Sequence, residues 1–216
     1  MEGYKELAQK APDTYNPDLA GTLSNLGTLH RVQKDYMQAK KYHEDALKLY
    51  KDLAEKDPKT YKINLAISLS NLGNVYIGLE QDEEAEACCT KALEVYRELA
   101  RKNPQSFTPY VAMNLNNLGL FYANKAKPNN AKSEECYKES LSIYRALASD
   151  HSQAWNPALA ETLVNIAIFY QNHVPNQALS MQRLTEAIAI LNQCRDIPLV
   201  IKLRARAEWA LEKWQR

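Results

Sequence analysis

The chain has 216 residues, 45% of them hydrophobic and only 6 of them glycine, so it can bury a substantial core and is not expected to be disordered. Its 27 Lys and Arg residues balance 26 Asp and Glu, which leaves no overall field to attract nucleic acid or an anionic membrane. The N-terminus lacks the apolar core of a secretory signal, and no apolar run approaches the length of about 18 residues that a membrane span needs. We therefore expect a cytoplasmic protein with neither nucleic acid nor membrane as a partner.

Two short patterns repeat in step along the chain. The first begins at Tyr4, Tyr50, Tyr96 and Tyr144, as in Tyr50-Lys-Asp-Leu-Ala, and its tyrosines are 46, 46 and 48 residues apart. The second keeps the same intervals and reads Leu-Ser-Asn-Leu-Gly from Leu23 and Leu69, Leu-Asn-Asn-Leu-Gly from Leu115, and Leu-Val-Asn-Ile-Ala from Leu163. Two markers that drift together predict four copies of one structural unit, with the two extra residues of the third interval lying around residues 125–130.

Each copy reads as a pair of helices. In the first copy, one helical stripe runs through Leu19, Leu23, Leu26 and His30, and after the polar break at 33–35 a second runs through Tyr36, Ala39, His43, Ala46, Leu47 and Tyr50. Prolines are expected at the joints, where they tolerate a helix first turn but not an interior: Pro12, Pro17, Pro58, Pro104, Pro109 and Pro157. Glycines within the first helices, Gly27, Gly73 and Gly119, cost about 1 kcal/mol each relative to alanine and predict close helix packing.

The chain is thus predicted to contain helical hairpins over residues 17–56, 60–102, 107–149 and 156–194. Residues 1–11 repeat the end of a second helix with no first helix before it. We therefore expect either that the chain is a piece of a longer array or that a second molecule covers its N-terminal end. The second reading implies a homodimer formed through the uncapped N-terminal end.

Residues 197–216 form another amphipathic helix, predicted to cap the apolar end of the stack. Its inner stripe contains Val200, Leu203, Ala207, Leu211 and Trp214, and its outside is expected to be solvated by Lys202, Arg204, Arg206 and Lys213. The alternative is that these basic residues form a nucleic-acid-binding patch. It is disfavoured because no exposed aromatic residues are interleaved with them and the domain as a whole is not basic.

The second copy resembles the tetratricopeptide repeat (TPR) signature, with Leu69, Leu72, Gly73 and Tyr76 in the first helix and Ala85, Cys89, Ala92 and Leu93 in the second. Departures keep the side chains small, with serine at Ser133 and Ser140 and alanine at Ala167. Because a usual repeat has about 34 residues, the longer period resembles the lengthened kind found in kinesin light chains. The resemblance implies an all-α, right-handed α-α superhelix (solenoid) of about four TPR hairpins plus a C-terminal capping helix, forming a single array over residues 1–216.

In such solenoids the candidate binding site is the concave surface lined by successive first helices. With Leu23 placed inward, a helical wheel turns Gly21, Asn25, Thr28 and Val32 toward this groove. The position of Asn25 is occupied by asparagine in all four first helices, at Asn25, Asn71, Asn117 and Asn165. The predicted peptide-binding residues are Asn25, Thr28, Asn71, Asn74, Asn117, Leu120, Asn165 and Ile168.

The four repeated asparagines resemble the ladders with which solenoids hold a peptide main chain, since a carboxamide can both donate and accept. A helix spacing near 10 Å matches about three residues of extended chain. The alternative is that each asparagine bonds an adjacent helix and sets the repeat spacing.

The expected function is a protein-protein interaction scaffold that binds an extended peptide or partner protein segment in the concave groove. Arg31 and Glu161 are the only charged residues near that face, so the ligand is expected to be neutral or mildly polar, unlike the acidic tails that basic TPR clamps hold. The alternative is a regulatory or oligomerising TPR segment of a larger protein with no separate peptide ligand.

An enzyme is not expected, and neither is a catalytic site, a metal site or a cofactor. The histidines have no repeated acid or nucleophile nearby, and His30 and His43 occupy positions at which TPR units normally pack an aromatic ring. The acidic cluster from Glu80 to Glu86 lacks the ligand spacing of a calcium loop, and no glycine-rich phosphate loop is present. The four cysteines, Cys88, Cys89, Cys136 and Cys194, contain no Cys-x-x-Cys pair and are read as small buried hydrophobes.

Overall fold

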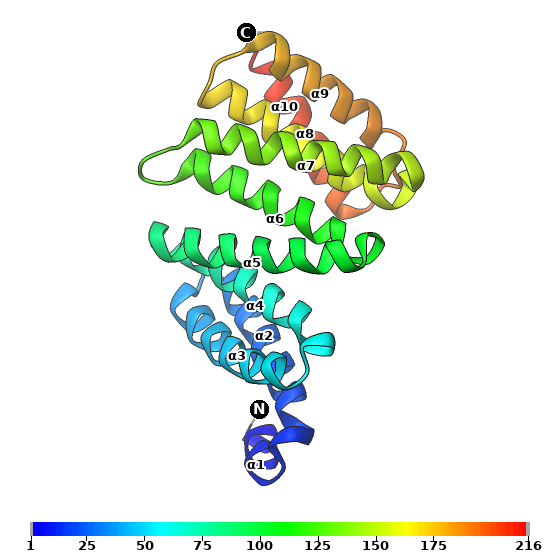
Figure 1. Cartoon of the computed structure of the whole chain (residues 1–216). Helices are drawn as coiled ribbons and strands as arrows, with labels where there is room; N and C mark the ends of the chain where they lie inside the picture. Colours follow the sequence, from blue (N-terminus) through cyan, green and yellow to red (C-terminus); the bar gives the residue numbers. More distant parts are fainter. Residues whose placement is uncertain (1, 215–216) are drawn as a thin grey trace. The chain divides into compact units, whose positions relative to one another are not determined.

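The computed structural model describes the backbone of residues 2–214 and, within this range, every side chain except those of residues 2, 4 and 5. Over these residues it contains helices and no strand, which confirms the predicted all-α class. The helices are α1 (Glu2–Lys10), α2 (Pro12–Val32), α3 (Tyr36–Lys56), α4 (Pro58–Gly78), α5 (Asp82–Lys102), α6 (Pro104–Asn124), α7 (Asn130–Asp150), α8 (Ser152–Asn172), α9 (Gln177–Leu191) and α10 (Pro198–Glu212). Figure 1 traces their order.

The chain divides into two compact units, residues 1–104 and residues 105–216. We call α2, α4, α6 and α8 the A helices and α3, α5, α7 and α9 the B helices, because each A helix is followed directly by its B helix. The connections at residues 33–35 and 79–81 are short, whereas the one at 125–129 is longer, so the insertion lies where the repeat intervals predicted it. Within unit 1, each helix packs on the next, as in a helical-repeat solenoid.

Side-chain caps set several helix starts. Asp35 accepts a hydrogen bond from the Gln38 amide at 3.2 Å, and Asp57 accepts one from the Thr60 amide at the same distance. Asn129 does the same at α7, where it accepts from the Lys132 amide at 3.0 Å. These bonds satisfy amides of the first turn that have no partner inside the helix.

The prolines only partly mark the joints. Pro12, Pro58 and Pro104 are first helical residues, as predicted, but Pro17, Pro109 and Pro157 lie inside α2, α6 and α8, so that prediction was wrong for these three. A proline removes the bond to the carbonyl four residues earlier. Those carbonyls belong to residues 13, 105 and 153, all exposed, so water can satisfy them and the helix continues.

In unit 1, α1 packs against the first hairpin in the place of a preceding B helix, with Ala8 buried against Leu19, Leu23 and Ala46. The A and B helices approach closely at the glycines. A Cβ on Gly27 would lie 2.7 Å from the ring of His43. The predicted reason for glycine in mid-helix is thereby confirmed.

In unit 2, a buried core runs through α6 to α10 and includes Tyr137, Leu163, Leu184 and Leu203. The serines that replace small alanines gain partners on the facing A helix. The Ser133 hydroxyl donates to the Gly119 carbonyl at 2.7 Å, and the Ser140 hydroxyl donates to the Ala112 carbonyl at 2.8 Å. Each substitution therefore adds a hydrogen bond without adding volume.

The terminal helix α10 packs on α8 and α9, as the sequence predicted. Its position is held by polar contacts as well as by the buried side chains of Val200, Leu203 and Ala207. Arg204 does not solvate the outside: its guanidinium donates to the Leu191 carbonyl at 2.8 Å and to Asp196 at 3.0 Å, so that expectation was wrong. A cation at the end of α9 is favoured because the last carbonyls of a helix carry partial negative charge.

Among residues 2–214, no helix combines the length and the apolar character needed to cross a membrane.

Candidate functional site

The predicted face in unit 1 lies on α2 and α4, which are in contact with each other. Asn25 is exposed, and Thr28, Asn71 and Asn74 are partly exposed. The Thr28 hydroxyl donates to the carbonyl of Ser24 at 3.0 Å, which holds its side chain against its own helix. The carboxamides of Asn25, Asn71 and Asn74 form no hydrogen bond with any other residue of the described range, so their donors and acceptors remain available to a ligand.

The predicted face in unit 2 lies on α6 and α8. Asn117 is partly exposed and likewise makes no hydrogen bond among residues 2–214, Leu120 is exposed, and Ile168 is half-buried. Asn165 differs from the other repeated asparagines, because only 5% of it is exposed and its amide donates to the Asn116 side-chain oxygen at 3.2 Å. At this position the structure has the inter-helix bond that the sequence left open as the alternative.

Exposed apolar side chains border these asparagines. Leu29 and Val32 follow Asn25 by four and seven residues, so they lie on the same side of α2, and both are exposed. Met113 lies on the same side of α6, four residues before Asn117 and in register with Gly21 of α2, and is exposed as well. Val32 and Met113 were placed on this face by the helical wheel, but Leu29 was missed. Its spacing of four from Asn25 is the signal that could have found it.

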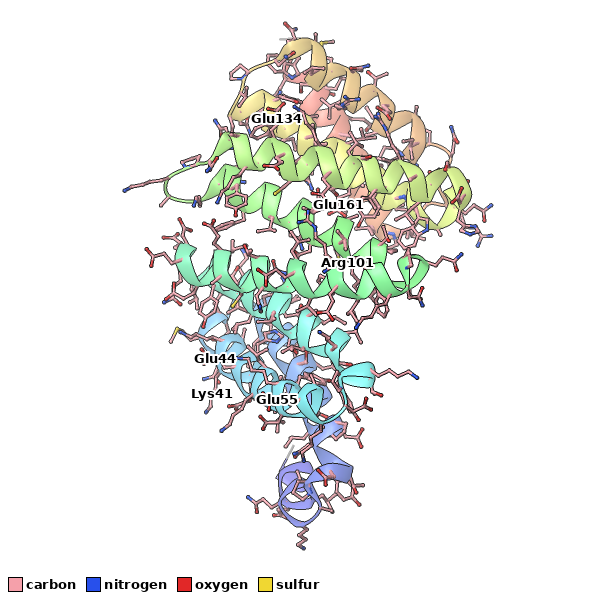
Figure 2. The ribbon with its side chains drawn as sticks, in the orientation of Figure 1. Lys41, Glu44, Glu55, Arg101, Glu134 and Glu161 are labelled. Carbon is pink, nitrogen blue, oxygen red and sulfur yellow. The ribbon has the colours of Figure 1, made fainter. Side chains whose placement is uncertain are left out.

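Charge is sparse on this face. Arg31 is partly buried, and Glu161 is exposed on α8, where Figure 2 labels it. Burial, together with the nearby negative charge of Glu161, raises the pKa of Tyr144 to about 12. The face therefore offers amides and apolar groups, and it has no cluster of lysines or arginines within the described chain that would hold an acidic ligand.

A tyrosine tethers an A helix to the preceding B helix in each unit. The Tyr76 hydroxyl donates to Glu44 at 3.1 Å in unit 1, and the Tyr170 hydroxyl donates to Glu134 at 2.7 Å in unit 2. Figure 2 labels both glutamates, on α3 and α7. Burial, together with the neighbouring glutamate, raises the pKa of both tyrosines to about 12. Both hydroxyls therefore stay protonated near neutral pH, and the bonds hold α4 and α8 in fixed orientations beside their neighbours.

A hollow in unit 2 lies away from the predicted face residues. It has a volume of about 570 Å³ and is lined by the start of α8 and the connection from α9 to α10, including Gln153, Cys194 and Arg195. Burial raises the pKa of the Cys194 thiol, which disfavours the reactive thiolate. No three His, Cys, Asp or Glu side chains are grouped closely enough to hold a metal ion within the range that the structure describes.

The two histidines of unit 1 pack against neighbouring residues, and His30 also lies beside an acid, with its Nδ1 3.3 Å from the Asp35 carboxylate. His43 is fully buried, and the ring of His30 stacks on Tyr42 with a centroid distance of 5.2 Å. These are the positions at which the resemblance predicted an aromatic packing role.

The tetratricopeptide repeat family model matches residues 18–98, from α2 to α5, so the resemblance is confirmed over this segment. Among solved structures, the chain is similar to the crystal structure of BtubC (BKLC) from P. vanneervenii, with a TM-score of 0.69 and 21% identity, over 100% of this chain and 85% of that one. At this identity the likeness shows the fold alone. No match is found among curated proteins. The matched repeats belong to a family of protein-interaction modules, which supports a scaffold role.

Proposed function

We propose that this chain, whose residues 18–98 are tetratricopeptide repeats, is a scaffold that holds an extended peptide segment of a partner protein along its A helices. One observation carries the proposal: Asn25 and Asn71 occupy the same repeat position in the two A helices of unit 1, Asn117 occupies it in α6 of unit 2, and each presents to solvent a carboxamide without a hydrogen bond among residues 2–214. A carboxamide can donate to one peptide group and accept from another, so the neighbouring pair on α2 and α4 can bind main chain without selecting its sequence, and Asn117 offers the same group in unit 2.

Neighbouring side chains would supply the selectivity. Thr28 and Asn74 add polar contacts, and Leu120 and Ile168 add apolar ones, together with Leu29, which the structure adds to the set. Because few charges lie on the face, a ligand that is neutral or mildly polar with some apolar anchors fits best. Long-range attraction would contribute little, so binding should depend only weakly on salt.

Asn165 has a smaller part in the proposal. It occupies the fourth ladder position, but it is nearly inaccessible and its amide is already bonded to Asn116. We infer that it mainly sets the spacing of α6 and α8, and that a peptide contact at this level would require the Asn116 bond to open.

The double variant Asn71→Ala, Asn117→Ala tests the proposal. It should weaken binding of a selected peptide by about tenfold to a hundredfold, because two net hydrogen bonds of about 0.5–1.5 kcal/mol are lost. The melting temperature should barely change, since neither carboxamide bonds another part of the described chain. Fluorescence anisotropy with labelled extended peptides, chosen from a library screen, measures the first effect, and circular dichroism measures the second.

Asn165→Ala is the matched control. It removes an inter-helix bond, so we expect about 1 kcal/mol of lost stability and peptide affinity within about twofold of the native chain. A library that yields no binding peptide, or a double variant that melts far below the native chain, would refute the ladder. Either result would favour the alternative, a regulatory or oligomerising segment of a larger protein.

A further inference from the structure

The outside of the terminal helix α10 is not the polar surface expected of a cap. Val200, Leu203, Ala207 and Ala210 are buried against the rest of unit 2. On the remaining sides, large apolar side chains are exposed: Ile197 by 47%, Leu199 by 58%, Ile201 by 51% and Trp209 by 56%. The outer face of a capping helix is normally polar, whereas α10 carries apolar side chains on its exposed sides as well as on its buried one.

Three of its exposed residues form a continuous row. Ile201, Ala205 and Trp209 are spaced by four, so they lie one above the other on the side of α10 that faces away from the core. We call them the outer stripe. Lys213 lies over the Trp209 ring, 4.2 Å from its centroid, yet the ring remains more than half exposed.

The outer stripe is presented on a helix that is firmly attached. The Gln171 amide of α8 donates to the Ala210 carbonyl at 3.1 Å, and Arg204 bonds the last carbonyl of α9. Beyond α10, the Trp214 indole donates to the Ser180 hydroxyl at 2.8 Å. Figure 1 shows α10, in red, among the helices of unit 2. A partner that docks here would therefore bind a helix that is already ordered, and little conformational entropy would be lost on binding.

Charges of opposite sign border the outer stripe on its two edges. On a helical wheel, Lys202 and Arg206 lie along one edge, and Glu208 lies along the other. Arg206 and Glu208 form no ion pair within residues 2–214, and two residues of separation prevent them from facing each other on one helix. Each is available to a charge of opposite sign on a second surface.

We propose that the outer stripe binds the outer stripe of a second copy of this chain, with the two α10 helices parallel about a twofold axis. The segregated charges select this arrangement. A twofold axis parallel to the helices sets the basic edge of one copy against the acidic edge of the other, whereas a perpendicular axis would set each edge against itself. With a rise of about 1.5 Å per residue, Arg206 and the partner's Glu208 differ by only about 3 Å along the axis.

The row itself suits this pairing. With the axis parallel to the helices, each residue of the row meets its own copy, and the small Ala205 side chain at the centre lets the two helices approach while Ile201 and Trp209 pack on their counterparts above and below it. The contact is isologous, so each ion pair occurs twice. The surface is distinct from the proposed peptide face and from the N-terminal end for which the sequence predicted a homodimer.

Light scattering coupled to size exclusion, over a range of micromolar concentrations, should give a mass approaching twice the 24.6 kDa monomer. Arg206→Glu places like charges opposite each other at two symmetric points, so it should raise the dimer dissociation constant by about tenfold or more. The exchange variant Arg206→Glu, Glu208→Arg restores both pairs and should return the constant to within about threefold of the native value.

Ile201→Glu should give a monomer, with a circular dichroism spectrum unchanged because residue 201 is exposed. Lys127→Glu is the control for Arg206→Glu, since it makes the same charge change in unit 2 but outside α10, and it should leave the dimer intact. A native chain that stays monomeric overturns the proposal. So does a dimer that survives Ile201→Glu and is lost in Leu7→Glu, because that result places the contact at the N-terminal end.

Discussion

Lowering the pH from 7 to 5 is expected to destabilise the first hairpin by about 2 kcal/mol through His43 alone, and by about 3 kcal/mol at pH 4. His43 is 0% exposed, and its ring packs against Gly27 where α2 and α3 cross. Burial, reinforced by the positive charge of Arg31, lowers the pKa of His43 from 6.5 to about 4.

The direction of the effect follows from proton counting. The unfolded chain binds a proton at His43 below pH 6.5, whereas the folded chain binds it only near pH 4. Between these values the unfolded state holds more protons, so the free energy of unfolding falls as the pH falls. The contribution of neutral His43 is fully present above pH 6.5.

Urea unfolding of the native chain and of His43→Tyr, followed by circular dichroism from pH 7 to pH 4, tests this. Tyr137 fills the equivalent place against Gly119, so tyrosine suits the site and does not titrate in this range. The matched variant is needed because Glu98 and Glu134 have lowered pKa values in the folded chain, so their protonation also reduces the free energy of unfolding as the pH falls. If the free energy of unfolding fell by the same amount with pH in both proteins, the buried site would have to accept the charged imidazole, and the prediction would be wrong.

Gly119→Ala is expected to destabilise the chain by up to about 2 kcal/mol, although alanine is the better helix former. The added Cβ would lie 2.7 Å from the Tyr137 ring, and Tyr137 is too deeply buried to move aside. Overpacking of this kind costs about 1–3 kcal/mol, while the gain in helix propensity is about 1 kcal/mol. Urea unfolding measures the net loss.

The fourth repeat provides the compensating change. There Ala167 replaces the glycine, and Leu184 takes the place of Tyr137, as the matching Ser133 and Ser180 bonds to the facing carbonyls show. The double variant Gly119→Ala, Tyr137→Leu should therefore be about 1–2 kcal/mol more stable than the sum of the two single changes predicts. Strict additivity would mean that the alanine and the ring do not meet.

The A-helix face was largely readable from the sequence. Because side-chain direction in a helix follows the period of 3.6 residues, knowing that Leu23 is buried is enough to place Asn25 and Val32 on the opposite side. Asn165 occupies the same register position and is nevertheless buried, since its exposure depends on how α8 sits among its neighbours. Helical periodicity contains no information about that placement.

The sequence by itself determined the all-α class, the number and order of the hairpins, the place of the two-residue insertion and the close crossing at the glycines. Each of these depends on residues near one another in the chain or on a pattern repeated at a constant interval. Only the tertiary structure decided that Pro17 lies inside a helix, that Arg204 is bonded to α9, and that the outer stripe of α10 is exposed. These features depend on which surfaces meet when the helices pack, and a contact between distant segments leaves no periodic trace in a single sequence.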